Sequence, residues 1–463
     1  NNTAALHVGN HTDTWSSDIE IYNTGELEVN AGGEVKVDDV LGVQGGGTLD
    51  INAGAVHAKW LGKNGSAANA LRVDNSGILT MDGAASLLAV YGCYSESTSY
   101  RSLFFNTTST IAIADGTVKF GRNPWNDQPN CYVNFGTQVL KNVEVDTSGT
   151  KYIRTEHLWN VNGNMTLTSG NLNSTNQNIN LGGNWAAVAG TYTGGTTGTV
   201  TFFTPSGGTY THNVSGATTF NHLACSTAGS TLIFGTGAAN ATTVNGNLTL
   251  AGASGNPIAV RSSVAGEYFL LSVKGTTRTA TWTTVKDSDA SFSSGKHMDA
   301  TSNCTNLGHN RLWLFTSACT APLCTVNTVN TGFMGIQRVE LAGLNNYTGT
   351  VNNEYEDFSW LVTNVTRGST YTLAVTGWTY EQYFKAWIDW NRDCDFLDEG
   401  EEIDIGTVEA VSSSVQLTIP AFAIAGNVKM RIRSDFYLAG TPDTECVDLQ
   451  YGETEDYTLN ILY

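Results

Sequence analysis

Gly47-Thr-Leu-Asp-Ile51 and Gly163-Asn-Met-Thr-Leu167 share a five-residue pattern of Gly, any residue, apolar, any residue, apolar. Alternation with period two places the apolar side chains on one face of a short strand, and the leading Gly permits a tight corner before it. The pattern recurs at Gly25-Glu-Leu-Glu-Val29, Gly33-Glu-Val-Lys-Val37, Gly77-Ile-Leu-Thr-Met81, Gly116-Thr-Val-Lys-Phe120, Gly198-Thr-Val-Thr-Phe202 and Gly246-Asn-Leu-Thr-Leu250. We therefore expect an array of short strands over residues 20–250.

Strands this short cannot bury a face alone, but stacked coils share one continuous core. Two architectures fit the pattern, a right-handed parallel β-helix and a string of antiparallel sandwiches. Uninterrupted repetition without an amphipathic helix favours the parallel β-helix, or β-solenoid, which we assign to residues 1–320. The Asn-rich turn at residues 173–178 predicts side-chain amide ladders between coils.

A second module is expected at residues 324–463, because composition shifts near Thr320-Ala-Pro322. These 140 residues carry 21 Asp and Glu against 7 Lys and Arg, a net charge of −14 out of −19 for the whole chain. Short alternating segments separated by turns indicate an antiparallel β-sandwich. The predicted strands are 371–375, 384–388, 415–419, 428–433 and 457–461. The whole chain is thus predicted to be all-β.

The charge balance excludes several classes of partner. Of 463 residues only 14% are charged, with 23 Lys and Arg against 42 Asp and Glu. Nucleic-acid binding and attachment to an anionic membrane both need clustered cations, so both are disfavoured. No apolar run approaches the roughly 18 residues that cross a bilayer, so we expect no membrane insertion.

The start of the chain and its cysteines indicate an extracellular protein. The sequence begins Asn1-Asn2-Thr3 without an initiator Met or a leader, so we expect a mature chain whose targeting segment was removed or was never included. Its eight Cys contain no CxxC pair, and a Lys-poor secreted chain predicts at least two disulfides. Two pairings suggested by flanking strand-like segments are Cys304 with Cys319 and Cys93 with Cys131.

No catalytic constellation is evident in residues 1–320. The one adjacent acidic pair, Asp38-Asp39, follows a predicted strand and fits a solvated turn. His222 lies in an alternating segment, where a strand residue with a satisfied side chain is expected. β-Helix enzymes that act on polysaccharides need clustered carboxylates. We therefore expect that the chain is not an enzyme.

The acidic segment after the predicted strand 384–388 is a candidate cation site. Asp389, Asn391, Asp393 and Asp395 place oxygen ligands at positions 1, 3, 5 and 7 of a tight loop. Ca²⁺ takes six to eight oxygen ligands, and alternate residues can point into one concavity. An EF-hand is not supported, because Cys394 occupies its Gly position and the flanking segments are predicted strands. The sequence therefore predicts a structural Ca²⁺ site.

Residues 324–463 resemble the GEVED domain, a bacterial extracellular β-sandwich. The resemblance is carried by Cys324, the segment 383–396, Gly400-Glu401, Arg431-Ile-Arg433, Cys446 and Gly452-Glu-Thr-Glu-Asp-Tyr457. By position it implies a metal loop of Asp389, Asn391, Asp393, Asp395 and Glu401, with Glu453, Glu455 and Asp456 as contributors. Cys394 replaces the Gly usual in the loop, which either distorts the loop or ties it to Cys446 by a disulfide.

Aromatic residues in the same module suggest a glycan-binding surface. Trp378, Tyr380 and Trp390 would form a stacking platform for sugar rings if they were exposed. Burial in the sandwich core is the alternative interpretation, because strand alternation turns some of these rings inward.

Residues 183–250 also resemble the β-solenoid repeats of bacterial surface and adhesin-like proteins. The similarity is carried by Gly183-Asn-Trp185, Gly198-Thr-Val-Thr-Phe202, Ala217-Thr-Thr-Phe-Asn-His-Leu223 and Thr243-Val-Asn-Gly-Asn-Leu-Thr-Leu250. We expect a secreted, non-catalytic structural or adhesive surface protein that assembles with itself into a filament, since an open solenoid end exposes unpaired backbone groups. The alternatives are a polysaccharide-binding adhesin and a polysaccharide-active β-helix enzyme.

Overall fold

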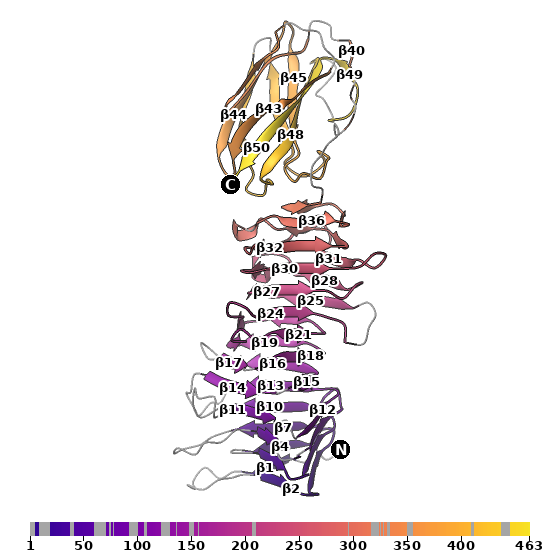
Figure 1. The fold of residues 1–463 in the computed structure, drawn as a ribbon, viewed down its shortest axis with the longest axis vertical. Helices are drawn as coiled ribbons and strands as arrows, with labels where there is room; N and C mark the ends of the chain where they lie inside the picture. Colours follow the sequence, from indigo (N-terminus) through magenta and orange to yellow (C-terminus); the bar gives the residue numbers. More distant parts are fainter. Residues whose placement is uncertain are drawn as a thin grey trace. The chain divides into compact units, whose positions relative to one another are not determined.

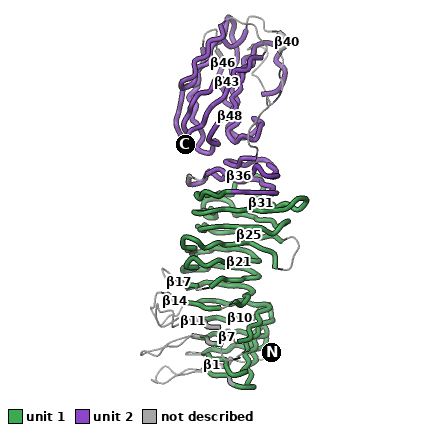
Figure 2. The backbone as a smooth tube through the Cα atoms, in the orientation of Figure 1, with its two compact units in different colours: residues 1–278 green, residues 279–463 purple. Residues whose placement is uncertain are grey.

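The computed structural model divides the chain into two compact units, residues 1–278 and 279–463 (Figure 2). It describes residues 5–8, 19–37, 41–59, 71–73, 76, 78–91, 101–105, 109–121, 130–135, 137–147, 152–155, 157–205, 210–294, 296–315, 324, 326, 328–330, 334–349, 355–408, 412–436 and 445–463. Strands dominate, and the helical elements among these residues are two short 3-10 turns, η1 (Ala238–Asn240) and η2 (Phe292–Ser294). No helix in this part of the chain has the length and apolar character needed to cross a membrane.

The first unit is a parallel β-solenoid in which each coil contributes one strand to each of three faces (Figure 1). The first face is one sheet: β1 (Ala5–Val8), β4 (Glu34–Val37), β7 (Ala55–Lys59), β10 (Leu87–Tyr91), β13 (Thr117–Gly121), β16 (Asn142–Asp146), β19 (Met165–Ser169), β22 (Trp185–Ala187), β25 (Thr211–Ser215), β28 (Thr231–Phe234) and β31 (Ile258–Ser262). Strands three apart in the chain are therefore neighbours in the sheet. This confirms the β-helix over the string of antiparallel sandwiches.

Each of the other two faces is divided into two sheets. The second face has β2 (Ile19–Tyr22), β5 (Leu41–Gln44), β8 (Leu71–Val73), β11 (Arg101–Phe105), β14 (Asn130–Asn134), β17 (Tyr152–Thr155), β20 (Asn171–Asn173) and β23 (Thr191–Thr193), then β26 (Thr218–Phe220), β29 (Thr242–Val244) and β32 (Phe269–Val273). The third has β3 (Glu26–Val29), β6 (Thr48–Ile51), β9 (Ile78–Met81) and β12 (Thr110–Ile113), then β15 (Val139–Leu140), β18 (Trp159–Val161), β21 (Ile179–Leu181), β24 (Thr199–Phe202), β27 (His222–Cys225) and β30 (Leu248–Ala251). Hydrogen bonding is thus interrupted between β12 and β15.

The apolar positions of the five-residue pattern form the solenoid core, as predicted. In β6, Leu49 and Ile51 are fully buried, whereas Thr48 and Asp50 are half-buried. The preceding Gly47 is required by close packing, since a Cβ there would lie 2.3 Å from the carbonyl oxygen of Ile21 in the coil below. Edge-to-face ring pairs such as Phe135 on Trp159 also pack in this core.

Asparagine side chains join successive coils at the corners. Oδ1 of Asn142 accepts the backbone N–H of Asn164 at 2.9 Å, and Asn164 and Asn184 repeat this contact one coil further on. In the Asn-rich turn, Asn176 Oδ1 accepts backbone N–H groups of the next coil, including that of Thr197 at 3.1 Å. The expected ladders are therefore mainly amide to backbone rather than amide to amide.

The second unit begins with parallel strands of the same kind. β36 (Met298–Ser302) pairs with β33 (Arg278–Thr281) and β39 (Trp313–Leu314), β34 (Thr283–Val285) with β37 (Thr305–Asn306), and β35 (Ser288–Asp289) with β38 (Asn310–Arg311). The change from these coils to the sandwich falls between β39 and β40. The predicted boundary at 320–324 lies in this interval, where most residues are outside the described part of the chain, whereas the compact units divide at residue 278.

Two sheets form the C-terminal sandwich. One has the order β42 (Leu344–Tyr347), β41 (Ile336–Leu341), β44 (Thr370–Gly377), β47 (Ser413–Thr418), and the other the order β43 (Tyr355–Thr366), β50 (Glu453–Leu462), β48 (Gly426–Phe436), β45 (Gln382–Ile388), β46 (Glu402–Val408). Pairing is antiparallel as expected, except that β43 runs parallel to β50 and a short β40 (Thr328–Asn330) runs parallel to β49 (Leu449–Tyr451). The apolar core between the sheets includes Phe384, Ile388, Trp390 and Tyr457.

Candidate metal centre

The acidic segment 389–401 forms a tight loop between the paired strands β45 and β46. The backbone of Arg392 and Cys394 has positive φ, 57° and 75° respectively, which turns the chain sharply. Cys394 therefore adopts a conformation that favours Gly. It is also disulfide-bonded. The turn is thus retained although Cys394 replaces the Gly expected at this position.

Side-chain oxygens hold the loop in shape by accepting backbone N–H groups. Asp389 Oδ1 accepts the N–H of Asp393 at 3.1 Å, and its Oδ2 accepts that of Cys394 at 3.3 Å. Glu401 Oε1 accepts the N–H of Trp390 at 2.8 Å, which joins the end of the loop to its beginning. Asp389 and Glu401 are both almost completely buried.

Three carboxylates converge within this frame. Asp393, Asp395 and Asp398 each offer an oxygen, and these oxygens lie within 4.8 Å of one another. Two oxygens on opposite sides of a Ca²⁺ ion are about 4.6–5.2 Å apart, because each Ca–O bond is about 2.3–2.6 Å. Asn391 Nδ2 donates to Asp393 Oδ2 at 3.0 Å and also to Asp398. The spacing and the oxygen-only chemistry therefore fit a hard cation.

The electrostatics of the loop also favour a cation. Burial raises the pKa of Asp389 to about 7 and that of Glu401 to about 10, and the neighbouring carboxylates add to both shifts. The pKa of Asp393 is raised to about 8, first by burial and then by Asp395, Asp398 and Asp389. Loss of these protons leaves buried like charges close together, which a divalent ion would neutralise.

The loop carboxylates line a cavity of about 710 Å³ together with residues from the last parallel coils of the same unit. Asn306 Nδ2 donates to Asp393 Oδ2 at 2.8 Å, and Arg311 pairs with Glu399 at 2.9 Å. Sequence reasoning missed Asn306, because a single Asn 87 positions before its partner leaves no local pattern. Sequence reasoning also missed Asp398, whose carboxylate converges with those of Asp393 and Asp395. The prediction had instead added Glu453, Glu455 and Asp456 to the loop residues.

The eight predicted ligands do not form one cluster. Asp389, Asn391, Asp393, Asp395 and Glu401 share the loop, whereas Glu453, Glu455 and Asp456 lie on β50. Asp456 makes a two-pronged ion pair with the buried Arg431, with distances of 2.7 and 2.8 Å. The Asp456 carboxylate is therefore neutralised by a cation of the protein itself.

Glu453 and Glu455 lie on the other face of β50 from Asp456. Strand alternation groups them with Tyr457, Leu459 and Ile461, which belong to the core between the sheets. Ile388, the last residue before the loop, is paired with Met430 on β48, and Met430 is paired with Tyr457 on β50. Glu453 is paired with Ser434, four residues further along β48. The two glutamates are thus displaced along the strand from Asp389 and do not contribute to its loop.

The cysteine pairings differ from those expected. Cys446 is bonded to Cys324, so the predicted link between Cys394 and Cys446 is wrong. Cys304 is a free thiol, which also makes its pairing with Cys319 wrong, and Cys225 is a buried free thiol. Of the predicted pair Cys93 and Cys131, Cys93 lies outside the described residues. Register explains the observed bond: β40 and β49 pair near Cys324 and Cys446.

The three predicted glycan-contact residues have different environments. Trp390 is 1% exposed and belongs to the sandwich core, so its assignment as a contact is wrong; its Nε1 donates to the carbonyl of Gly400 at 3.0 Å. Tyr380 is 51% exposed and Trp378 is half-buried, both in the turn between β44 and β45. Of the three predicted contacts, Tyr380 therefore has the exposed ring.

Stacking of the solenoid coils creates a polar row that sequence reasoning missed. His57 lies 3.1 Å from Glu34 and 3.1 Å from the hydroxyl of Tyr91, in neighbouring coils. Further along the same sheet, Lys119 lies between Glu144 at 2.8 Å and Asp146 at 3.1 Å. The groups pair with one another, as in an ion-pair ladder. His222 is satisfied as predicted, because its Nδ1 accepts the N–H of Asn247 at 2.7 Å.

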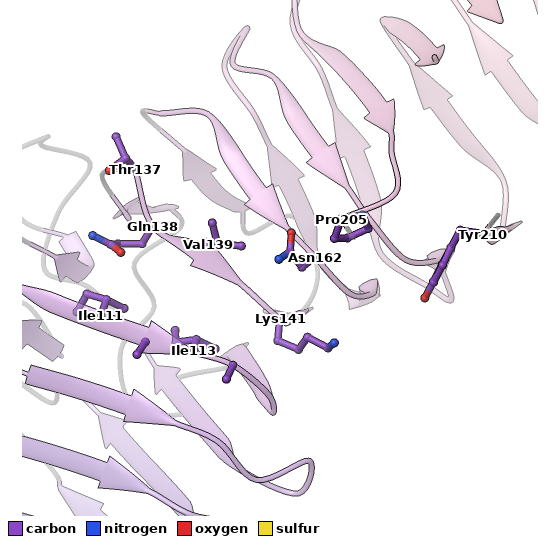
Figure 3. Close-up of a pocket in the computed structure, with 11 residues that line it drawn as sticks. Ile111, Ile113, Thr137, Gln138, Val139, Lys141, Asn162, Pro205 and Tyr210 are labelled. Carbon is purple, nitrogen blue, oxygen red and sulfur yellow. The ribbon is translucent and has the colours of Figure 1, made fainter. Parts of the chain in front are cut away.

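A groove of about 630 Å³ marks the interruption between β12 and β15 (Figure 3). Ile111 and Ile113 lie on one side and Val139 on the other, with the polar side chains of Gln138 and Asn162 beside them. Lys141 and Tyr210 also line the groove. The mixture of apolar, amide and phenol groups could accept an extended polar ligand such as a glycan.

Comparison with known proteins identifies one region of the chain. The family model of the GEVED domain matches residues 383–460, which cover the loop and strands β45 to β50. No curated protein and no solved structure matches the chain significantly. A GEVED domain is consistent with an extracellular, surface-associated adhesive protein. The chain thus combines a long parallel β-solenoid with a C-terminal GEVED domain at residues 383–460.

Proposed function

We propose that this chain is a secreted, non-catalytic structural and adhesive surface protein whose GEVED module is stabilised by Ca²⁺. The proposal is supported by the stacked solenoid coils, which form a scaffold. It is also supported by the GEVED domain, a module of surface proteins. The disulfide between Cys324 and Cys446 agrees with an oxidising compartment.

One observation carries the calcium part of the proposal, the convergence of Asp393, Asp395 and Asp398 within 4.8 Å. Asn391 and the buried Asp389 and Glu401 surround these three carboxylates. Bound Ca²⁺ would neutralise the loop and fix it against Asn306. Because unfolding would release the ion, Ca²⁺ binding adds directly to the stability of the folded module.

Thermal unfolding with and without chelator tests this proposal. Ca²⁺ at 100 times its Kd contributes about 2.7 kcal/mol. Since 1 kcal/mol shifts the Tm of a domain of this size by about 2–4 °C, chelator should lower the Tm of the second unit by about 5–10 °C. The transition of the first unit should stay in place. No shift in either transition would refute the calcium site.

A matched pair of variants sharpens the experiment. Asp393→Asn removes a central ligand charge and should reduce the effect of chelator on the Tm of the second unit by the contribution of the loop site. Asp404→Asn changes an exposed Asp whose Oδ1 accepts the N–H of Gly406 at 2.8 Å, a contact that Asn can keep. The control should retain the full Ca²⁺ response, and an equal loss in both variants would argue against a specific loop.

Glycan binding is the second candidate function, supported by exposed Tyr380 and by the groove at β12 and β15. A glycan array followed by calorimetry tests it, with Tyr380→Ala and Asn162→Ala assigning any ligand to the module or to the groove. Catalysis on polysaccharides is the third and least supported candidate. It predicts new reducing ends on incubation with polysaccharides, and we expect none.

Self-assembly into a filament is the remaining part of the proposal. Within the described residues, β1, β2 and β3 are each the last strand of their sheets. Such edges present unpaired backbone donors and acceptors that a second copy of the chain can bind. Binding of further copies of the chain at these edge strands would lengthen the stack of coils into a filament.

A further inference from the structure

We propose that Glu356, Glu453 and Glu455 form a second cation site, which takes a hard divalent ion such as Ca²⁺ between strands β43 and β50. The site is separate from the Asp393 loop and goes beyond the function proposed above. It would attach β43, an edge strand of its sheet, to the neighbouring strand β50.

Strand register brings the three glutamates together. Glu356 on β43 is paired with Glu455 on the parallel strand β50, so their side chains share one face. Glu453 lies two residues before Glu455 on that same face. One carboxylate oxygen from each residue lies within 4.8 Å of those of the other two. This spacing fits oxygens around a single Ca²⁺ ion.

The two glutamates of β50 are buried and incompletely bonded. Glu453 is 2% exposed and Glu455 is fully buried. Glu453 Oε2 accepts the N–H of Ile336 at 2.8 Å, and Glu455 Oε2 accepts the hydroxyl of Tyr457 at 2.7 Å. The Oε1 atom of each is buried without a hydrogen-bond partner. Two buried acceptors are thus available in a site where an unpaired polar group is costly.

The nearby arginines do not compensate these charges. Arg431 and Arg433 on β48 lie opposite Asp456 and Thr454 of β50, on the other face of the sheet. Arg431 pairs with Asp456, and Arg433 donates to Thr454 Oγ1 at 3.2 Å. The core-facing side of β48 at this level carries Ile432 and Ser434 instead. A bound cation would therefore supply positive charge that these arginines do not.

The backbone is also shaped around the cluster. A Cβ at Gly335 would lie 2.6 Å from Glu453 Oε2, so Gly at this position lets the Ile336 N–H reach the carboxylate. Burial raises the pKa of Glu453 to about 9 and that of Glu455 to about 8, with other carboxylates of the cluster as further causes. Bound protons are thus the alternative to a cation, and experiment must separate the two.

Counting bound Ca²⁺ on the full chain tests the proposal. Chelator-stripped protein is dialysed against radiolabelled Ca²⁺ in 0.15 M NaCl, which screens loose surface binding. We expect two ions per chain. Glu453→Gln with Glu455→Gln should retain one ion, Asp393→Asn should retain the other, and the combined variant should bind none. Asp456→Asn, next to Glu455 but on the opposite face, should retain both.

The outcomes separate this proposal from the loop site. One ion in the wild type, lost in Asp393→Asn and kept in the Gln variant, would overturn the second site and leave the loop site intact. One ion in the wild type, kept in Asp393→Asn and lost in the Gln variant, would support the second site and reject the loop site. Two ions kept by the Gln variant would also overturn the proposal and favour bound protons. A wild-type protein that binds no Ca²⁺ would reject both sites.

A spectroscopic measurement guards against misfolding of the Gln variant. Tb³⁺ occupies Ca²⁺ sites, and its luminescence is sensitised by aromatic side chains close to the ion. In the Asp393→Asn background, Tb³⁺ emission should persist and should fall several-fold on adding Tyr457→Phe with Glu455→Gln. Far-UV circular dichroism of each variant should match the wild type. Emission that disappears already in Asp393→Asn would contradict a second site.

Discussion

Glu455 and Asp456 are adjacent in the chain, yet their carboxylates lie on opposite faces of β50. Asp456 meets Arg431, which is fully buried, whereas Glu455 faces the core and retains an unbonded oxygen. A buried charge is tolerated when it is paired, and an unpaired one requires a proton or an ion. Neighbouring acidic residues of one motif therefore have different chemical roles.

Asp456→Asn should destabilise the second unit without affecting Ca²⁺ binding. The substitution leaves Arg431 as an uncompensated buried charge, and breaking such a pair typically costs about 3–5 kcal/mol. Urea unfolding of the second unit in saturating Ca²⁺ measures this cost. Pairing it with Arg431→Met should recover part of the loss, because no lone charge remains. A cost under about 1 kcal/mol would show that the ion pair is effectively solvated.

His212 should make the first unit sensitive to acid. Its ring is fully buried, its Nδ1 donates to the carbonyl of Gly183 at 2.9 Å, and burial lowers its pKa below the usual 6.5. The folded state therefore favours neutral imidazole. Its stabilising contribution is complete above pH 6.5 and is lost as the pH falls from 6.5 towards the folded-state pKa.

Urea midpoints of the first unit at pH 7.5 and 5.5 test this expectation. The wild type should lose more stability between the two pH values than His212→Phe, which cannot be protonated. Equal losses in the two proteins would mean that His212 is not the acid-sensitive group.

Prediction from sequence succeeded at this scale where the signal was local. The acidic loop at 389–401 was predicted because its oxygen-bearing side chains alternate within one short segment, and the proposed Ca²⁺ site depends on that loop. Trp390 was misassigned because alternation in the sequence does not show that this residue, two positions beyond the end of β45, packs into the sandwich core. Asn306 was missed because its contact with Asp393 depends on how distant strands fold together.

At the scale of the strand, glycine controls how closely solenoid coils approach. Gly216 has φ +79°, and a Cβ there would lie 1.8 Å from the carbonyl oxygen of Ala187 in the preceding coil. Gly255 has a similar φ of +71°, but nothing lies within 4 Å of its Cβ position. The two sites therefore separate backbone strain from a clash between coils.

Gly216→Ala should cost much more stability than Gly255→Ala. The left-handed conformation costs Ala about 1–2 kcal/mol at either site. At Gly216 displacement of the neighbouring coil should bring the total to about 3 kcal/mol or more. Urea midpoints of the first unit compare the two variants directly. Equal midpoints would mean that the coils yield without cost.

The Gly-initiated pattern located eight of the solenoid strands, β3, β4, β6, β9, β13, β19, β24 and β30. Leu49 and Ile51 illustrate why: a short alternating segment after Gly has one apolar face, and only stacking buries it. The parallel pairing of β43 with β50 was not foreseen. Pairing between segments about 100 residues apart leaves no trace in local periodicity, although it assembles the Glu356 cluster.

For the whole molecule, composition predicted an acidic C-terminal module from residue 324 after a nearly neutral repeat array, whereas the compact units divide at residue 278. Composition carries no information on the proposed contact between copies of the chain. β3 supplies a specific edge to examine. The N–H of Thr48 donates to Gly25 O and that of Asn52 to Val29 O, both at 2.9 Å. The N–H and C=O groups of successive residues point to opposite sides of a strand. The groups of Leu27 therefore point toward β6, like those of Gly25 and Val29, whereas the N–H of Glu28 points away from β6.

Glu28→Pro should therefore weaken self-assembly while leaving the fold intact. Proline removes an outward N–H and is tolerated at an edge whose N–H is not used within the fold. Sedimentation and electron microscopy over a concentration series with Ca²⁺ should show filaments of the wild type and at least tenfold weaker association of the variant. Leu27→Pro is the matched control, since it removes an N–H that faces β6 and should lower the Tm of the first unit. Wild-type protein that stays dispersed at every concentration would contradict assembly, and unchanged filaments of Glu28→Pro would place the contact elsewhere.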